Sequence, residues 1–168
     1  MLTINQSLTL LDLSENQIET SGSRALADSL SVNHTLISLN LGFCHIKDIQ
    51  KLSDVLSVNQ TLKFLNLGSN EIEMNGIQTL AHSLKVNQSL TSLDLGLDWI
   101  GTIGAQALAE ALQINQTLTS LNLKDNQIGV DGALALALLV NYTLTSLDLN
   151  WNQIGDSWGP TVGLSIKS

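Results

Sequence analysis

The chain has 168 residues, of which 43% are hydrophobic and only 4% aromatic, so Leu, Ile, Val and Ala must fill its interior. Its formal net charge is −8, with 7 basic and 15 acidic residues, which argues against nucleic acid or an anionic membrane as partner and favours a protein with a basic surface. Cys44 is the only cysteine, which excludes an intrachain disulfide and favours a cytosol-like compartment.

The first ten residues lack a basic segment followed by an apolar run, so no secretory signal is predicted. No apolar stretch approaches the roughly 18 residues that a membrane span needs, and we expect a soluble chain.

One pattern, L-x-x-L-x-L-x-x-N-x-I, recurs along the chain with little change. Successive copies start 28, 26, 28, 28 and 26 residues apart. A fixed period of roughly 20–50 residues indicates a stacked array, in which each unit buries its apolar face only against its neighbours. The six copies cover residues 8–18, 36–46, 62–72, 90–100, 118–128 and 144–154.

The stretches between these copies are typical of helices. In residues 22–30 and 104–112, Leu recurs at positions i and i+4 with Ala between, which gives one apolar stripe with small neighbours. A helix of this kind can lie close to the sheet that it covers. The two 26-residue units need a shorter return between strands.

These in-phase matches, from about Leu2 to Ile154, resemble the leucine-rich repeat family and within it the ribonuclease-inhibitor-like subfamily. The resemblance implies an α/β fold: a right-handed solenoid or horseshoe segment, with parallel strands on the concave face and helices on the convex face, as a single domain over residues 1–168. The spacing of the elements agrees, because strands pair about 4.8 Å apart whereas helices need roughly 8–10 Å, so the stack must bend with its strands inside.

The Asn position of the pattern is predicted to satisfy backbone groups where the chain leaves each strand. Cys44 takes this position in the second unit, where the resemblance implies a structural thiol. Asp98 takes it in the fourth, where we expect a carboxylate that lies nearer water or accepts extra backbone N–H bonds. Asparagine fills it in the other four units: Asn16, Asn70, Asn126 and Asn152.

The pattern is incomplete at both ends of the chain. Leu2 and Ile4 fit the last turn of a preceding helix, and the residues after Ile154 depart from the repeat. Two interpretations remain open: Trp158 to Ile166 form a degenerate lid, or the chain is a piece of a longer array.

Six Asn-x-Ser/Thr sequences fall at one phase of the repeat. They could be glycosylation sites of a secreted protein. We favour a structural interpretation, in which each Asn ends a helix with a left-handed cap and the Ser or Thr begins the next strand. The asparagines are Asn5, Asn33, Asn59, Asn87, Asn115 and Asn141.

No catalytic, cofactor-binding or metal site is predicted. His34, His45 and His82 fall at different phases of the repeat, so nothing gathers them around a metal ion. Cys44 has His45 beside it, but neighbours on a strand point to opposite faces. We therefore predict a protein that is not an enzyme and needs no cofactor.

Two alternatives stay open. The GTPase-activating protein of the nuclear-transport GTPase is similar in repeat length, and an arginine finger would be the generic device for that activity. The only arginine, Arg24, lies in a helical segment, and the acidic tail of that family is missing. The other alternative is a purely structural solenoid segment.

The main prediction is a non-catalytic scaffold that binds a partner protein on its concave face. A hydrated polar sheet face would explain the Asp, Asn and Ser residues there, but it does not explain exposed rings and leucines, which are typical of a protein-binding patch. The acidic residues would select basic residues of the partner. The predicted partner-binding residues are Asp12, Glu15, Phe43, Phe64, Asp94, Leu97, Asp125, Asp148 and Trp151.

Ribonuclease-inhibitor-like repeats resemble sensor modules of cytosolic immune receptors and also bacterial effectors delivered into a host. We therefore expect a cytoplasmic protein, in its own cell or in a host cytoplasm. The sequence leaves the identity of the partner and the oligomeric state open.

Overall fold

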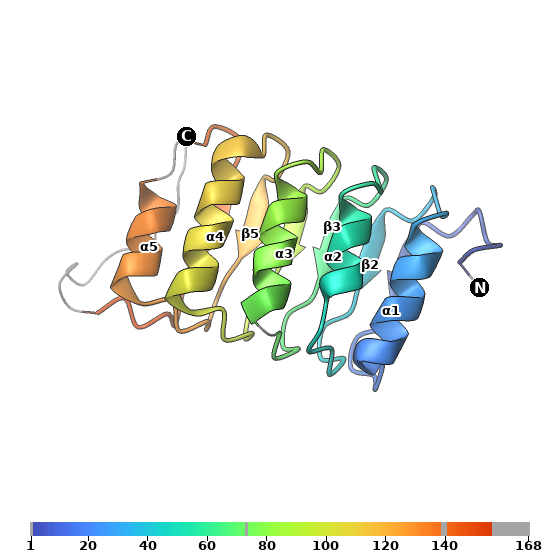
Figure 1. Ribbon diagram of the computed structural model, residues 1–168, viewed down its shortest axis with the longest axis horizontal. Helices are drawn as coiled ribbons and strands as arrows, with labels where there is room; N and C mark the ends of the chain where they lie inside the picture. The colour runs from blue at the N-terminus through green and yellow to red at the C-terminus, as the bar shows by residue number, and fades with distance from the viewer. Residues whose placement is uncertain (1, 73, 139–140, 156–168) are drawn as a thin grey trace.

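The computed structural model describes residues 2–72, 74–138 and 141–155. Within these residues, six parallel strands alternate with five helices (Figure 1). The predicted lid, residues 158–166, lies outside them. The elements in chain order are β1 (Leu10–Asp12), α1 (Glu19–Leu30), β2 (Ser38–Asn40), α2 (Gln50–Leu56), β3 (Phe64–Asn66), α3 (Met74–Leu84), β4 (Ser92–Asp94), α4 (Gly101–Ile114), β5 (Ser120–Asn122), α5 (Gly129–Ala137) and β6 (Ser146–Asp148).

The sheet keeps the strands in sequence order, and equivalent residues of successive units are paired in register, for example Leu39 with Leu65 and Leu65 with Leu93. The helices form a second layer on one side of the sheet (Figure 1). The predicted α/β repeat solenoid is therefore confirmed. Both 26-residue units have short helices, with 7 residues in α2 and 9 in α5, against 11 to 14 in the other three.

The core is a lattice of leucines between the two layers. The central leucines of the interior strands, such as Leu39 and Leu65, are buried, as are helix residues such as Leu30 and Leu84. Gly104 lets α4 approach this lattice, because a Cβ there would lie 2.5 Å from Ile100 Cγ2. Each unit thus contributes a thin apolar layer that only its neighbours can bury.

A ladder of side chains joins the units where each strand ends, as predicted. Asn70 donates from Nδ2 to the carbonyl oxygens of Leu41 (2.8 Å) and Leu67 (2.6 Å), and its Oδ1 accepts the N–H of Cys44 at 2.9 Å. Cys44 is buried, and its Sγ donates to the Leu13 carbonyl oxygen at 3.1 Å. The thiol therefore donates to the preceding unit as the amide of Asn70 does in the next unit.

The structure distinguishes the two arrangements expected for the carboxylate of Asp98, which were a position nearer water and extra hydrogen bonds from backbone N–H groups. The residue is 0% exposed, so a position near water is wrong. Its Oδ1 accepts the N–H groups of Asn70 at 2.8 Å and Ile72 at 3.5 Å, which is the other expected arrangement.

A second ladder explains the Asn-x-Ser/Thr sequences. Asn59 donates from Nδ2 to the carbonyl oxygens of Leu30 and Asn33, and its Oδ1 accepts the N–H groups of Thr61 and Leu62. Because this side chain is 3% exposed and fully bonded, it cannot carry a glycan in the folded chain. The expected left-handed cap is wrong: Asn115 is extended, with φ −68° and ψ 128°, because the side chain itself caps the turn.

Candidate protein-binding site

The exposed face of the sheet is built around a central column with one Asp or Asn at the end of each strand. Each side chain of the column accepts, through Oδ1, the backbone N–H two residues later; for Asp94 the donor is Gly96, at 2.9 Å. This bond fixes each side chain over the sheet. In Asp12, the hydroxyl and backbone N–H of Ser14 hold the carboxyl pKa below its ordinary value. The column consists of Asp12, Asn40, Asn66, Asp94, Asn122 and Asp148.

Three residues beyond the column, the chain turns through a left-handed residue, which we call the rim position. The N–H of Phe43 donates to the carbonyl oxygen of Gly68 at 3.0 Å, and that of Leu97 to the carbonyl oxygen of Lys124 at 2.9 Å. Positive φ puts the side chain of each rim residue out into solvent. The rim positions and their φ values are Glu15 (57°), Phe43 (55°), Ser69 (62°), Leu97 (65°), Asp125 (54°) and Trp151 (61°).

The apolar rim residues are well exposed: Phe43 is 58%, Leu97 45% and Trp151 76% accessible. A left-handed conformation costs a residue with a Cβ about 1–2 kcal/mol. Trp151 regains the least of that cost by burial, whereas Phe43 and Leu97 regain part of it through the buried fraction of their side chains. Stability alone therefore accounts least for Trp151 at the rim.

A hollow of about 230 Å³ lies in the middle of this face, over β2 to β5. Its floor includes the buried backbone of Gly42, Gly68 and Gly96, which occupy the same position in three successive units. A Cβ on Gly68 would lie 3.0 Å from the carbonyl oxygen of Gly96 and 3.1 Å from Asp94 Oδ1, so a side chain there would be in tight contact with both groups.

The hollow brings together three of the predicted partner-binding residues: Phe43, Asp94 and Leu97. Phe64 lies at the start of β3, between Ser38 and Ser92 of the neighbouring strands, and is 36% exposed. The remaining predicted residues lie on the outer units, with Asp12 and Glu15 at β1, Asp125 after β5, and Asp148 and Trp151 at β6.

Sequence reasoning missed seven residues that line the hollow: Gly42, Asn66, Gly68, Ser69, Gly96, Asn122 and Lys124. The recurrence of glycine at one position in three successive units was the available signal. It marks a place where the repeat leaves out a side chain while keeping its backbone.

The structure offers little to a catalytic mechanism. The described part of the chain contains no cluster of three or more His, Cys, Asp or Glu side chains that could hold a metal ion. Burial raises the pKa of Cys44, which disfavours the nucleophilic thiolate.

No helix among the described residues is both long and apolar enough to cross a membrane.

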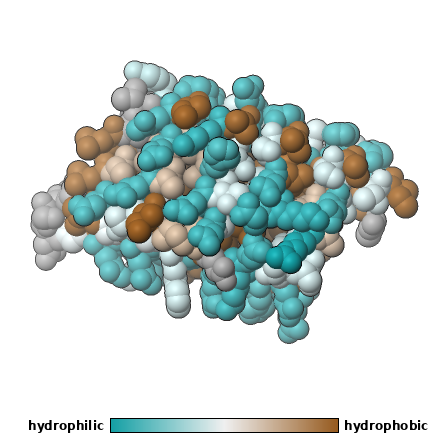
Figure 2. Space-filling model, in the orientation of Figure 1, coloured by the Kyte–Doolittle hydropathy of each residue, from teal (hydrophilic) through white to brown (hydrophobic). Residues whose placement is uncertain are grey.

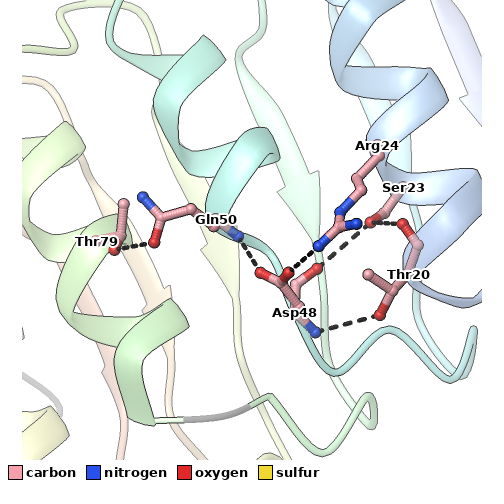
Figure 3. A network of polar contacts seen from close by, with 6 residues as sticks. All are labelled: Thr20, Ser23, Arg24, Asp48, Gln50 and Thr79. Atoms are coloured by element: carbon pink, nitrogen blue, oxygen red, sulfur yellow. Dashed lines mark hydrogen bonds and ion pairs between the residues drawn. The ribbon is translucent and has the colours of Figure 1, made fainter.

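Arg24 is already engaged on the helical side of the molecule. Its Nη2 lies 2.7 Å from Asp48 Oδ2, in a polar network that links the first three helices (Figure 3). The backbone N–H of Gln50 and this guanidinium hold the pKa of Asp48 below its ordinary value. An arginine finger must reach a bound nucleotide, and this arrangement does not favour that role for Arg24.

The helical face itself is mostly hydrophilic, with separate hydrophobic groups rather than one continuous patch (Figure 2).

Parallel strands in register, one layer of helices and side-chain ladders between units together define a repeat solenoid with a long accessible sheet face.

The chain belongs to the leucine-rich repeat family, ribonuclease-inhibitor-like type: the family model described as "Leucine Rich repeat" matches residues 5–27, 32–49, 58–81, 86–109, 115–137 and 140–157. Domains of this family commonly bind proteins and are usually non-catalytic. Among curated proteins there is no significant match to the chain.

Solved structures share the fold. The "Leiomodin-1 Actin-Binding Site 2 (ABS2)" structure is 23% identical, with a TM-score of 0.69 over 76% of this chain and 77% of that one. The tropomodulin C-terminal domain of Caenorhabditis elegans is 16% identical, with a TM-score of 0.68 over 81% and 84%. The leucine-rich repeat protein LegL7 of Legionella pneumophila is 23% identical, with a TM-score of 0.63 over 92% of this chain and 51% of LegL7.

Proposed function

We propose that the chain is a non-catalytic scaffold that binds a protein with a basic surface on its concave sheet face. The observation that carries this proposal is the presence of Phe43, Leu97 and Trp151 at exposed, left-handed rim positions. Bulky side chains that cost backbone energy and remain in water are expected where a partner buries them.

The charges on this face support a basic partner. Asp12, Asp94 and Asp148 stand in the central column, and Glu15 and Asp125 stand on the rim. Acidic groups placed around apolar anchors speed the encounter with a basic surface and select its orientation. A reducing, cytoplasmic location agrees with the single buried thiol of Cys44.

The similar fold of leiomodin-1 supports the class of function. That domain is named as an actin-binding site, so a leucine-rich repeat segment of this size serves there as a protein-binding unit. We carry over the kind of work, binding of a protein, and not the identity of the partner.

A comparison of two double variants tests the proposal. Phe43→Asn with Trp151→Asn removes both rings from positions where Asn accepts a positive φ. The control, Val32→Asn with Val58→Asn, removes two apolar side chains that are 51% and 67% exposed at the ends of helices. We expect proteins captured by the wild type to be lost with the rim variant and retained with the control. Equal capture by both variants would contradict the proposal.

A further inference from the structure

We propose that the hollow between Phe43 and Leu97 receives one arginine side chain of the partner, with its guanidinium against Asp94. This inference rests on the proposed function, because it names the chemistry by which the concave face would hold a basic partner. With this arginine site, the partner is selected mainly in the middle of the sheet rather than at its outer units.

The shape of the hollow suits an unbranched side chain. Phe43 follows β2 and Leu97 follows β4, so the two walls are about two strand spacings, roughly 10 Å, apart. The unit between them contributes the small rim residue Ser69, the buried backbone of Gly68 and the side chain of Asn66. The methylene stem of an arginine can pack against these two apolar walls while its charged end stays hydrated or paired.

The carboxylate of Asp94 is held in place for such a cation. Its Oδ1 accepts hydrogen bonds from the N–H of Gly96 at 2.9 Å and from Nδ2 of Asn122 at 3.0 Å. Its Oδ2 accepts no hydrogen bond from residues 2–72, 74–138 or 141–155, so one oxygen of a fixed acid remains available.

Arginine fits this site better than lysine. A planar guanidinium is weakly hydrated, stacks on an aromatic face such as that of Phe43, and donates to a carboxylate at the same time. A lysine ammonium would pair with Asp94 but would lose more hydration on entering the hollow.

Lys124 determines where in the hollow the cation sits. It lines the β5 side and makes no ion pair within the described chain, whereas Lys47, Lys51 and Lys85 each pair with an acid. Its ammonium repels a second cation and directs it toward Asp94 and Phe43. Removing this charge should therefore strengthen the binding of arginine, which is the opposite of the effect on an acidic ligand.

The test is an NMR titration of the whole chain with N-acetyl-arginine amide, using N-acetyl-citrulline amide as an uncharged ligand of the same shape. We expect saturable shifts of the Gly68, Ser69 and Gly96 amide signals with the arginine amide and none with the citrulline amide. Asp94→Asn keeps an oxygen for the Gly96 N–H and should weaken binding about two- to fivefold. Lys124→Gln should strengthen it about two- to threefold.

Asp131→Asn is the control, because Asp131 is an exposed acid in the first turn of α5, away from the hollow, and should leave the titration unchanged. Equal shifts with the citrulline amide, unchanged binding to Asp94→Asn, or preferential binding of N-acetyl-glutamate amide through Lys124 would each overturn the proposal.

The outcome separates this inference from the proposed function. If the rim variant loses its partner but the arginine amide does not bind, the concave face binds a protein and the hollow is not an arginine site. If the arginine amide binds and the rim variant keeps its partner, the hollow stands as a site and the anchor role of the rings fails.

Discussion

The buried carboxylate of Asp98 accepts the backbone N–H of Asn70 at 2.8 Å, just as the amide oxygen of Asn126 accepts the N–H of Asp98 at 3.0 Å one unit later. The two side chains differ in their second polar atom, which is Nδ2 in Asn126 and Oδ2 in Asp98. Nδ2 of Asn126 donates to the carbonyl oxygen of Leu95 at 2.6 Å, whereas Oδ2 of Asp98 is buried without a partner among the residues that the structure describes. A protonated Asp98 could donate from Oδ2, and an ionised one could not.

The first prediction is that Asp98→Asn removes a pH dependence of stability. Burial raises the pKa of Asp98 from 3.8 to about 7, and the negative charge of Asp94 adds to this effect. The folded state therefore binds the proton more tightly than the unfolded state. The stability from this proton is complete below pH 4, falls as the pH rises toward 7 and is lost above that pH.

Urea unfolding of wild type and Asp98→Asn at pH 5 and pH 8 measures this effect. The gain in the free energy of unfolding from Asp98→Asn should be about 2–3 kcal/mol larger at pH 8 than at pH 5, from roughly 1.4 kcal/mol for each unit of pH. Asp131→Asn, an exposed acid in the first turn of α5, is the control and should show no such difference. Parallel pH profiles for wild type and Asp98→Asn would rule out a protonated Asp98.

The second prediction concerns the rim and separates folding from binding. Phe43→Asn and Trp151→Asn each relieve a left-handed conformation that costs a bulky residue about 1–2 kcal/mol, and this relief offsets the loss of the buried part of each ring. The melting temperature should stay the same or rise while partner capture falls. A clear drop in melting temperature would show that these rings stabilise the fold instead.

The third prediction is that the Asn-x-Ser/Thr ladder is a main source of cohesion between units. Asn59→Ala removes four hydrogen bonds and leaves buried backbone groups without partners, so it should cost about 3 kcal/mol or more in the free energy of unfolding. Within residues 2–72, 74–138 and 141–155, the side chain of Asn5 bonds only locally, to Ser7 and Leu8. Asn5→Ala should cost less than about 1 kcal/mol in the same urea experiment. Equal losses would contradict the ladder.

The fold could be predicted because one short pattern fixes the phase of every strand. Leu39, Leu65 and Leu93 had to point inward, and Asn70 had to serve the backbone, wherever the units stack. The conformation of Asn115 and the burial of Asp98 could not be predicted, since each depends on groups in the preceding or following unit. The hollow depends on how Gly68 and Asp94 align across strands, which only the register reveals.

The last prediction tests the packing of helix against strand. Gly104→Ala places a Cβ 2.5 Å from Ile100 Cγ2 and 3.2 Å from Ile77 Cγ2, and both isoleucines are buried. Overpacking of this kind costs about 1–3 kcal/mol, which exceeds the gain of roughly 1 kcal/mol from replacing a helical glycine with alanine.

The matched variant is Gly22→Ala in α1, where a Cβ would lie 2.6 Å from Ile18 Cγ2. Ile18 is only half-buried and can move away, so the helical gain should offset the contact and leave the stability nearly unchanged. The measurement is the free energy of unfolding of the two variants. If Gly104→Ala is as stable as Gly22→Ala, Gly104 is not needed for the close approach of α4 to the leucine lattice.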